Sequence, residues 1–370
     1  MPVGEVAEVA DVGRISAEGS GIPIEDGGQL LAGELFPDEV FTNSGLTGRQ
    51  MQAKAKNMLY DWFVTFRKEG FTEWNSSPYL PIDTLGFGSL YAFAQDPAMR
   101  ELGREGMDFA YYLLAVHSQQ GIFASSSGRT YIKEQFGNWS NCPSGLSWIG
   151  YGYGVPGHAG KGITSYCLSD YEPPKEFAQW FSIPRGKEMI CQTTQGNDGY
   201  VDLYTYKTAD YMMTSANDFH PGEPGHQENP FQLTFNAVAQ LWVTHPGERV
   251  LFGAARPSYW AGNGTLPKVN QYKAFAGLIY DIAPEHPVDF THLYLPSMEF
   301  DRCEVEGKWA FVQLGSAYAA VYCSNGMRMQ DFGSNKDREC IAEGRRCIWL
   351  VRAAQADEFA AFEDFKVWMQ

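Results

Sequence analysis

The chain divides into two regions by the spacing of its hydrophobic residues. From residue 46 to about 118, apolar side chains recur every three or four positions, which is typical of amphipathic helices with one buried face. Thr47 stands where a helix N-cap belongs, and Asp96 followed by Pro97 marks the start of another helix. Short loops rich in proline and polar residues join these segments, so we expect neighbouring helices to pack antiparallel.

Beyond about residue 186 the apolar positions alternate with polar ones. Segments such as GYVDLYTYKT, KAFAGLIYDI and RCIWLVRAA are rich in β-branched and aromatic residues and are bounded by Gly, Pro, Asn and Asp. No helical pattern interrupts them, which favours an antiparallel β-sandwich over a parallel sheet. We therefore predict an α+β protein in which antiparallel helical hairpins precede the sandwich. The predicted parts are an extended segment over 1–45, a helical domain over 46–185 and a sandwich domain over 186–370.

Composition and charge narrow the classes of partner. No apolar run approaches the roughly 20 residues that a membrane helix needs, so we expect no membrane partner. A net charge of −16 argues against nucleic acid, because such binding needs a basic face. The first 40 residues lack the features of a secretory signal, which leaves open a cytoplasmic protein or a secreted one without its leader.

Several local motifs are too weak to predict a cofactor. The seven cysteines are scattered and none has CxxC spacing, which argues against a disulfide framework and a thiolate zinc site. GYGVPG at 152–157 matches G-x-G-x-x-G, but that motif needs a strand before it and a helix after it, and the following HAGKGITSY does not have a helical pattern, so we reject a dinucleotide site. We predict no cofactor.

One polar stretch and one serine-rich stretch remain as candidate sites. DFHPGEPGHQEN places His220, Glu223, His226 and Glu228 within nine residues, and a divalent metal could use such ligands. The spacing matches no zinc pattern, so a polar surface loop is the favoured interpretation and a substrate-contact loop the second. GIFASSSGRTY at 121–131 follows a predicted helix, and its simplest interpretation is a solvated loop.

The stretch EWNSSPYLPIDTLGFGSLY at 73–91 resembles the asparagine-bearing helix entry of the heparinase II/III-like polysaccharide lyases. In that group the asparagine is followed further along the chain by a catalytic tyrosine, and here Asn75 and Tyr131 lie 56 positions apart. The later text YKTADYMMTSANDFHPGEPGHQENPFQLTF and YWAGNGTLPKVNQYK resembles the β-sandwich half of a bacterial branch of the same group.

The resemblance implies a lyase that acts on a uronic-acid-containing glycan by β-elimination. Asn75 and Arg129 would neutralise the sugar carboxylate, and Arg129 would lower the pKa of Tyr131 so that it can act as base or acid. Many relatives have a histidine directly after the asparagine, where this chain has Ser76. His117 is therefore our first candidate for a second acid–base group, followed by His226 and His245.

The resemblance also implies an α/α toroid before the sandwich, but the predicted helical domain, 46–185, has fewer than 150 residues. We expect a partial toroid, completed by a missing N-terminal portion or by a second chain; a homo-oligomer is also left open. Candidate substrate contacts are Trp74, Tyr79, Trp148, His226, Glu228, Trp260 and Asn263.

Two other functions stay open on the sequence. The 20 tyrosines and 10 tryptophans could serve a non-catalytic carbohydrate-binding or assembly subunit through sugar stacking. A glycoside hydrolase with carboxylate catalysts is the third hypothesis. The 44 acidic residues offer many possible pairs, so they do not discriminate between these classes.

Overall fold

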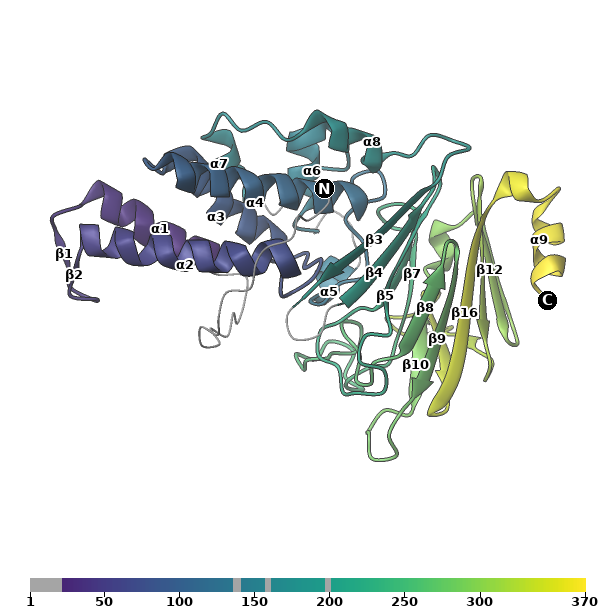
Figure 1. Cartoon of the computed structure of the whole chain (residues 1–370). Helices are drawn as coiled ribbons and strands as arrows, with labels where there is room; N and C mark the ends of the chain where they lie inside the picture. Colours follow the sequence, from purple (N-terminus) through teal and green to yellow (C-terminus); the bar gives the residue numbers. More distant parts are fainter. Residues whose placement is uncertain (1–21, 136–140, 157–160, 197–200) are drawn as a thin grey trace.

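The computed structural model describes residues 22–135, 141–156, 161–196 and 201–370. Helices make up most of the first part of the chain and strands most of the second, and the strands form antiparallel sheets, which confirms the α+β prediction (Figure 1). The helices of the first part are α1 (Ile22–Leu35), α2 (Gly48–Glu69), α3 (Leu80–Phe93), α4 (Pro97–Val116), α5 (Ile132–Gln135), α6 (Ser144–Tyr151), α7 (Ile163–Cys167) and α8 (Ala178–Phe181). The short strands β1 (Val40–Phe41) and β2 (Leu46–Thr47) pair between α1 and α2.

The predicted helix starts are confirmed at α2 and α4. The Thr47 side chain accepts a hydrogen bond from the backbone N–H of Gln50, and the Gln50 side chain accepts one from the N–H of Thr47, which makes a capping box. Asp96 caps α4 through the N–H of Ala98, with Pro97 in the first turn. These caps satisfy backbone donors that the helices themselves leave free.

Helix α1 corrects the prediction of an extended segment over 1–45. Leu30 is fully buried in a core that also contains Leu59 of α2 and Leu90 of α3. Gly33 lies so close to the backbone of Gly48 that a Cβ atom there would be 2.6 Å from the Gly48 carbonyl oxygen. Gly33, one of the glycines that obscure the helical pattern in the sequence, thus lets α1 approach α2.

The strands form an eight-stranded and a six-stranded antiparallel sheet. The first has the order β14-β15-β10-β7-β6-β5-β4-β3 and the second the order β11-β12-β13-β16-β9-β8. Their bounds are β3 (Met189–Gln195), β4 (Val201–Lys207), β5 (Met212–Asn217), β6 (Phe231–Thr234), β7 (Gln240–Thr244), β8 (Lys268–Tyr272), β9 (Phe275–Asp281), β10 (Phe290–Tyr294), β11 (Arg302–Glu306), β12 (Trp309–Leu314), β13 (Ala317–Cys323), β14 (Arg328–Met329), β15 (Glu339–Glu343) and β16 (Arg346–Gln355). The strands predicted beyond residue 186 are therefore present.

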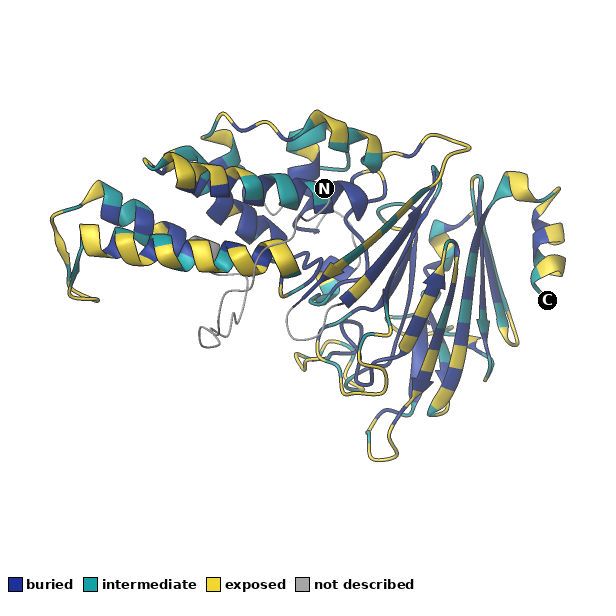
Figure 2. Ribbon diagram, in the orientation of Figure 1, coloured by how far each residue is buried: buried dark blue, intermediate teal, exposed yellow. Residues whose placement is uncertain are grey.

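The centre of the eight-stranded sheet is buried on both faces. Every residue of β6, β7 and β10 is buried, and Figure 2 shows this as dark blue along the strands of that sheet. Side chains from both sheets share one hydrophobic core, which includes Leu233, Val243, Leu278 and Val351. The C-terminal helix α9 (Phe362–Met369) packs its Phe365 on the outer face of β12 and β13 (Figure 1).

A buried amine joins the helical part to the eight-stranded sheet. The Nζ atom of Lys207, at the end of β4, donates hydrogen bonds to the carbonyl oxygens of Ala115 (2.9 Å) and Trp180 (2.7 Å). These are carbonyls of α4 and α8 that lie near the helix ends. Burial lowers the pKa of Lys207 to about 7. A neutral amine still has two N–H donors, which matches its two acceptors.

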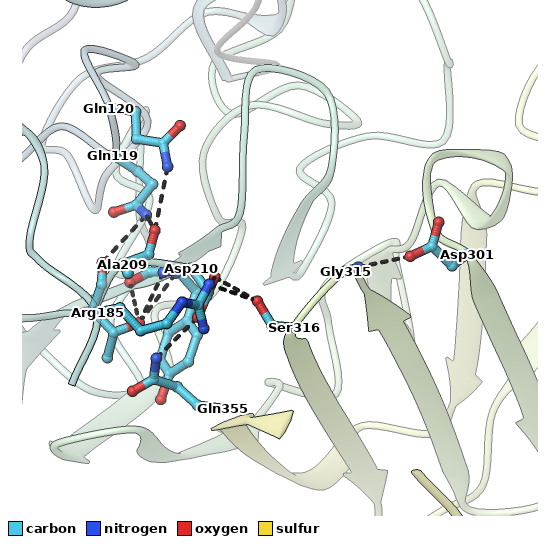
Figure 3. A network of polar contacts seen from close by, with 11 residues as sticks. Gln119, Gln120, Arg185, Ala209, Asp210, Asp301, Gly315, Ser316 and Gln355 are labelled. Carbon is cyan, nitrogen blue, oxygen red and sulfur yellow. Dashed lines mark hydrogen bonds and ion pairs between the residues drawn. The ribbon is translucent and has the colours of Figure 1, made fainter. Parts of the chain in front are cut away.

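The turn at 208–211 continues this junction into the second sheet (Figure 3). The Asp210 carboxylate accepts hydrogen bonds from Arg185 (2.8 Å), from Ser316 (2.9 Å) and from Gln355 (2.9 Å). Gln119, just after α4, donates to backbone carbonyls of the same turn. Four segments distant in the sequence thus meet at one tight turn.

Lys207 makes stability depend on pH. The pKa of its amine falls from 10.5 to about 7 on folding, so between these values the unfolded chain binds more protons. The contribution of this amine to the free energy of unfolding is fully present above pH 10.5 and is lost as the pH falls toward 7. We expect the free energy of unfolding to rise with pH in this window for the wild type, by several kcal/mol more than for Lys207→Met, as measured by urea unfolding.

Lys187→Met is the matched control, because Lys187 is an exposed lysine. It should keep the wild-type pH dependence. Equal slopes for the wild type and Lys207→Met would contradict the assignment.

Candidate functional site

The serine-rich segment at 121–127 lies buried on the eight-stranded sheet. The backbone N–H of Ser126 donates to the Thr214 hydroxyl of β5 (2.8 Å), and the Thr234 hydroxyl of β6 donates to the Ala124 carbonyl (2.6 Å). Ser127 and Asn229 exchange two backbone hydrogen bonds. The interpretation as a solvated loop is therefore wrong, because the sheet supplies the hydrogen bonds that water would otherwise make.

Two cavities lie where this segment leaves the sheet. The smaller, of about 280 Å³, is lined by Thr72, Glu73, Trp74, Gly128, Arg129, Gly196, Val201, Phe219, His220, His226 and Glu228. The larger, of about 660 Å³, is lined by Pro78, Tyr79, Ile82, Thr130, Tyr131, Ile132, Lys133, Glu134, Lys161, Gln227, Gly253, Ala254, Ala255, Arg256, Ser258 and Ala261. Both cavities are lined by the same three stretches of chain, 72–79, 128–134 and 226–228, so the cavities are neighbours.

Arg129 and Tyr131 link the two cavities. An Arg129 guanidinium nitrogen donates to the Tyr131 hydroxyl (3.2 Å), while another pairs with the Glu73 carboxylate (2.5 Å). The guanidinium also lies over the Tyr79 ring, 4.7 Å from its centre. Arg129 lines the smaller cavity and Tyr131 the larger one, so this hydrogen bond crosses from one to the other.

The surroundings of Tyr131 favour its ionised form. The hydrogen bond from Arg129 is the largest cause that lowers its pKa, and the positive charges of Arg129 and Arg256 and a hydrogen bond from Gln227 act in the same direction. The Arg256 guanidinium lies 5.4 Å from the centre of the ring. Partial burial opposes the shift without reversing it. The structure thus brings Arg129 and Tyr131 together.

Asn75 lies beside this pair but does not line either cavity. Its side chain is buried, its amide donates to the Ser126 carbonyl (3.3 Å), and its oxygen accepts from Gln195 (3.1 Å). Its φ of 48° is a left-handed conformation that asparagine tolerates better than most residues. The observed contacts give Asn75 a positioning role, because both ends of the amide are bound to protein.

The three candidate histidines occupy different environments. His117 is buried at the end of α4, bonded to the Thr205 hydroxyl (2.9 Å), and burial lowers its pKa to about 3. His245 is also buried, with a pKa lowered to about 3 for the same reason, and contacts the Val288 carbonyl. His226 is exposed and lines the smaller cavity. Of the three, only His226 is placed to exchange protons with a ligand there.

Four of the seven candidate substrate contacts line a cavity, namely Trp74, Tyr79, His226 and Glu228. The other three do not. Trp148 is half exposed on α6, Trp260 stacks on the buried His292 ring at 4.2 Å, and the Asn263 amide bonds the Glu228 carbonyl and the His245 N–H.

The polar stretch after β5 contributes His220, His226 and Glu228 to the smaller cavity, while Glu223 contacts His220 at 3.4 Å. This placement agrees better with a ligand-contact loop than with a plain surface loop. Within the described residues, no three His, Cys, Asp or Glu side chains are grouped so that they could hold a metal ion.

Sequence reasoning missed several residues of the site. Glu73 holds Arg129 through an ion pair, and Gln227 forms a hydrogen bond with Tyr131. Lys161 and Arg256 line the larger cavity. One signal was present in the sequence: the polar stretch at 220–228 contains His226 and Glu228, which line the smaller cavity, and Gln227, which lines the larger one. No local pattern marks Lys161 or Arg256.

No protein-family model, curated protein or solved structure matches this chain. Among the helices of the described ranges, none has the length and apolarity needed to cross a bilayer.

The Arg129–Tyr131 contact can be tested without a substrate. Arg129→Met removes both the hydrogen bond and the charge, so we expect the pKa of Tyr131 to rise toward its ordinary value. Nuclear magnetic resonance titration of isotope-labelled tyrosine measures this, with Tyr131→Phe identifying the signal. Arg328→Met, a change of an exposed arginine on β14, is the control and should leave that signal unchanged. A Tyr131 pKa that stays the same in Arg129→Met would show that the two side chains do not interact in solution.

Proposed function

We propose that the protein is a lyase that cleaves a uronic-acid-containing polysaccharide or oligosaccharide by β-elimination. The observation that carries this proposal is the hydrogen bond between Arg129 and Tyr131, on the wall of a cavity, with the pKa of Tyr131 lowered. In architectural terms we propose that the helices correspond to a partial α/α toroid and the two sheets to a β-sandwich.

The elimination requires removal of the proton on C5, next to the sugar carboxylate. That proton is weakly acidic, so the reaction needs a base and a positive charge that stabilises the enolate-like transition state. Tyr131 in its ionised form is the proposed base. The electron pair released at C5 forms the new double bond with C4, and the bond from C4 to the leaving oxygen breaks. The protonated Tyr131 then returns its proton to that oxygen.

We propose that Arg129 alone neutralises the sugar carboxylate, without the help from Asn75 that the sequence suggested. The Asn75 amide is occupied by Ser126 and Gln195, so we assign it to holding the two loops together. Glu73 is a positioning residue, because its ion pair at 2.5 Å holds Arg129 beside the Tyr131 hydroxyl. His226 replaces His117 as the proposed second acid–base group.

Hydrolysis by a carboxylate pair is less well supported. Glu73 and Glu228 both line the smaller cavity and are the acids that such a mechanism would use there. The Glu73 carboxylate is held in an ion pair with Arg129 at 2.5 Å, so it is not free to contact the oxygen of a glycosidic bond. The contacts of Glu73 therefore favour elimination.

Replacing Tyr131 by Phe tests the proposal directly. The change removes one hydroxyl and should lower the rate of elimination by about 100-fold or more, since general base catalysis contributes that much. The measurement is ultraviolet absorbance of the conjugated alkene formed from a panel of uronate glycans.

Tyr60→Phe makes the same chemical change on the exposed side of α2 and is the matched control. Full activity in Tyr131→Phe would refute the site. Reducing ends released without an alkene would indicate a hydrolase, and binding without cleavage by the wild type would favour the carbohydrate-binding subunit.

A further inference from the structure

The larger cavity has an excess of positive charge. Its lining includes the cations Lys133, Lys161 and Arg256 and a single carboxylate, Glu134. Glu134 is buried and pairs with Lys133 at 3.1 Å, so those two charges offset each other. Lys161 and Arg256 form no ion pair with any other described residue. Two uncompensated cations therefore border one cavity.

This local charge is opposite to that of the whole chain. With a net charge of −16, the protein repels anions at long range, and an acidic ligand needs a concentrated basic site to bind. Arg185, by comparison, is paired with the Asp210 carboxylate at 2.8 Å. The free cations of the larger cavity are thus placed where an anionic group would find a counterion.

The positions of Arg129 and Tyr131 indicate where the reacting sugar lies relative to the two cavities. Tyr131 belongs to the lining of the larger cavity, while its partner Arg129 belongs to that of the smaller one. A sugar whose carboxylate contacts Arg129 and whose C5 proton faces Tyr131 lies at the boundary between the two cavities. The next sugar of the chain then extends into one of the cavities, and the larger has the space of about 660 Å³ to receive it.

We propose that the larger cavity is a subsite for a second acidic group of the same glycan, bound by Lys161 and Arg256. This inference rests on the proposed function. It restricts the substrate to a chain that carries an anionic group, carboxylate or sulfate, on the sugar next to the reacting one. A glycan with a single uronic acid between neutral sugars lacks the group that this subsite binds.

Direct binding tests the subsite apart from catalysis. Isothermal titration calorimetry of the full chain in the Tyr131→Phe background prevents turnover, with oligosaccharides of alginate, of polygalacturonate and of heparin as acidic probes and dextran as the neutral one. We expect at least one acidic probe to bind and dextran not to. Lys161→Gln combined with Arg256→Gln should weaken that binding by about tenfold or more and reduce its salt dependence.

The matched control is Lys187→Gln combined with Arg328→Gln, which removes the same charges from exposed positions outside both cavities. It should bind as tightly as the parent. Equal affinity of the two double variants overturns the subsite, and so does the absence of binding to every acidic probe.

The two proposals fail in distinguishable ways. If the wild type forms no alkene but the Lys161 and Arg256 variant loses affinity, the elimination is refuted and the anion subsite stands. If the wild type forms an alkene and the variant keeps its affinity, the subsite is refuted and the lyase stands.

Discussion

The buried amine of Lys207 is the constraint on which the rest of the structure depends. Lys207 lies at the end of β4 and binds carbonyls near the ends of α4 and α8. It therefore fixes where the helical part meets the eight-stranded sheet. The turn that follows it fixes the same junction to the second sheet through Asp210. Because α4 ends at this point, the chain that leaves it must run along the buried face of the sheet, and that chain carries Arg129 and Tyr131.

The site follows from this path. Residues 124–127 are bound to β5, β6 and Asn229, so the following residues leave the sheet at a defined place. The backbone N–H of Gly128 donates to the Trp74 carbonyl (2.7 Å), and a Cβ atom on Gly128 would lie 2.6 Å from the indole nitrogen of Trp74. This close approach brings Glu73 to Arg129. The ion pair is therefore a consequence of how tightly the two loops pack.

Local patterns were predictable from the sequence, and tertiary ones were not. The caps at Thr47 and Asp96 and the alternation of the strands depend on neighbouring residues, so they can be recognised in a single chain. Helix α1 was missed because its glycines conceal its period. The burial of 121–127 depends on partners about 90 positions away, such as Thr214, and no local signal reveals it. Tyr131 was found through the resemblance and its spacing from Asn75, and Arg129 because it lies two positions before Tyr131, whereas Arg256 comes from a distant loop.

Electrostatics gives the two cavities complementary roles. Arg129 is paired with Glu73, and this ion pair orients the guanidinium toward the Tyr131 hydroxyl. Arg256 forms no such pair among the described residues, and it lies over the Tyr131 ring from the side of the larger cavity. An acidic group bound to Arg256 would offset that charge and favour the protonated form of Tyr131. The hydrogen bond from Arg129 is the largest cause of the lowered pKa of Tyr131 and is made from the side of the smaller cavity, so it keeps Tyr131 available as the base while the larger cavity is occupied.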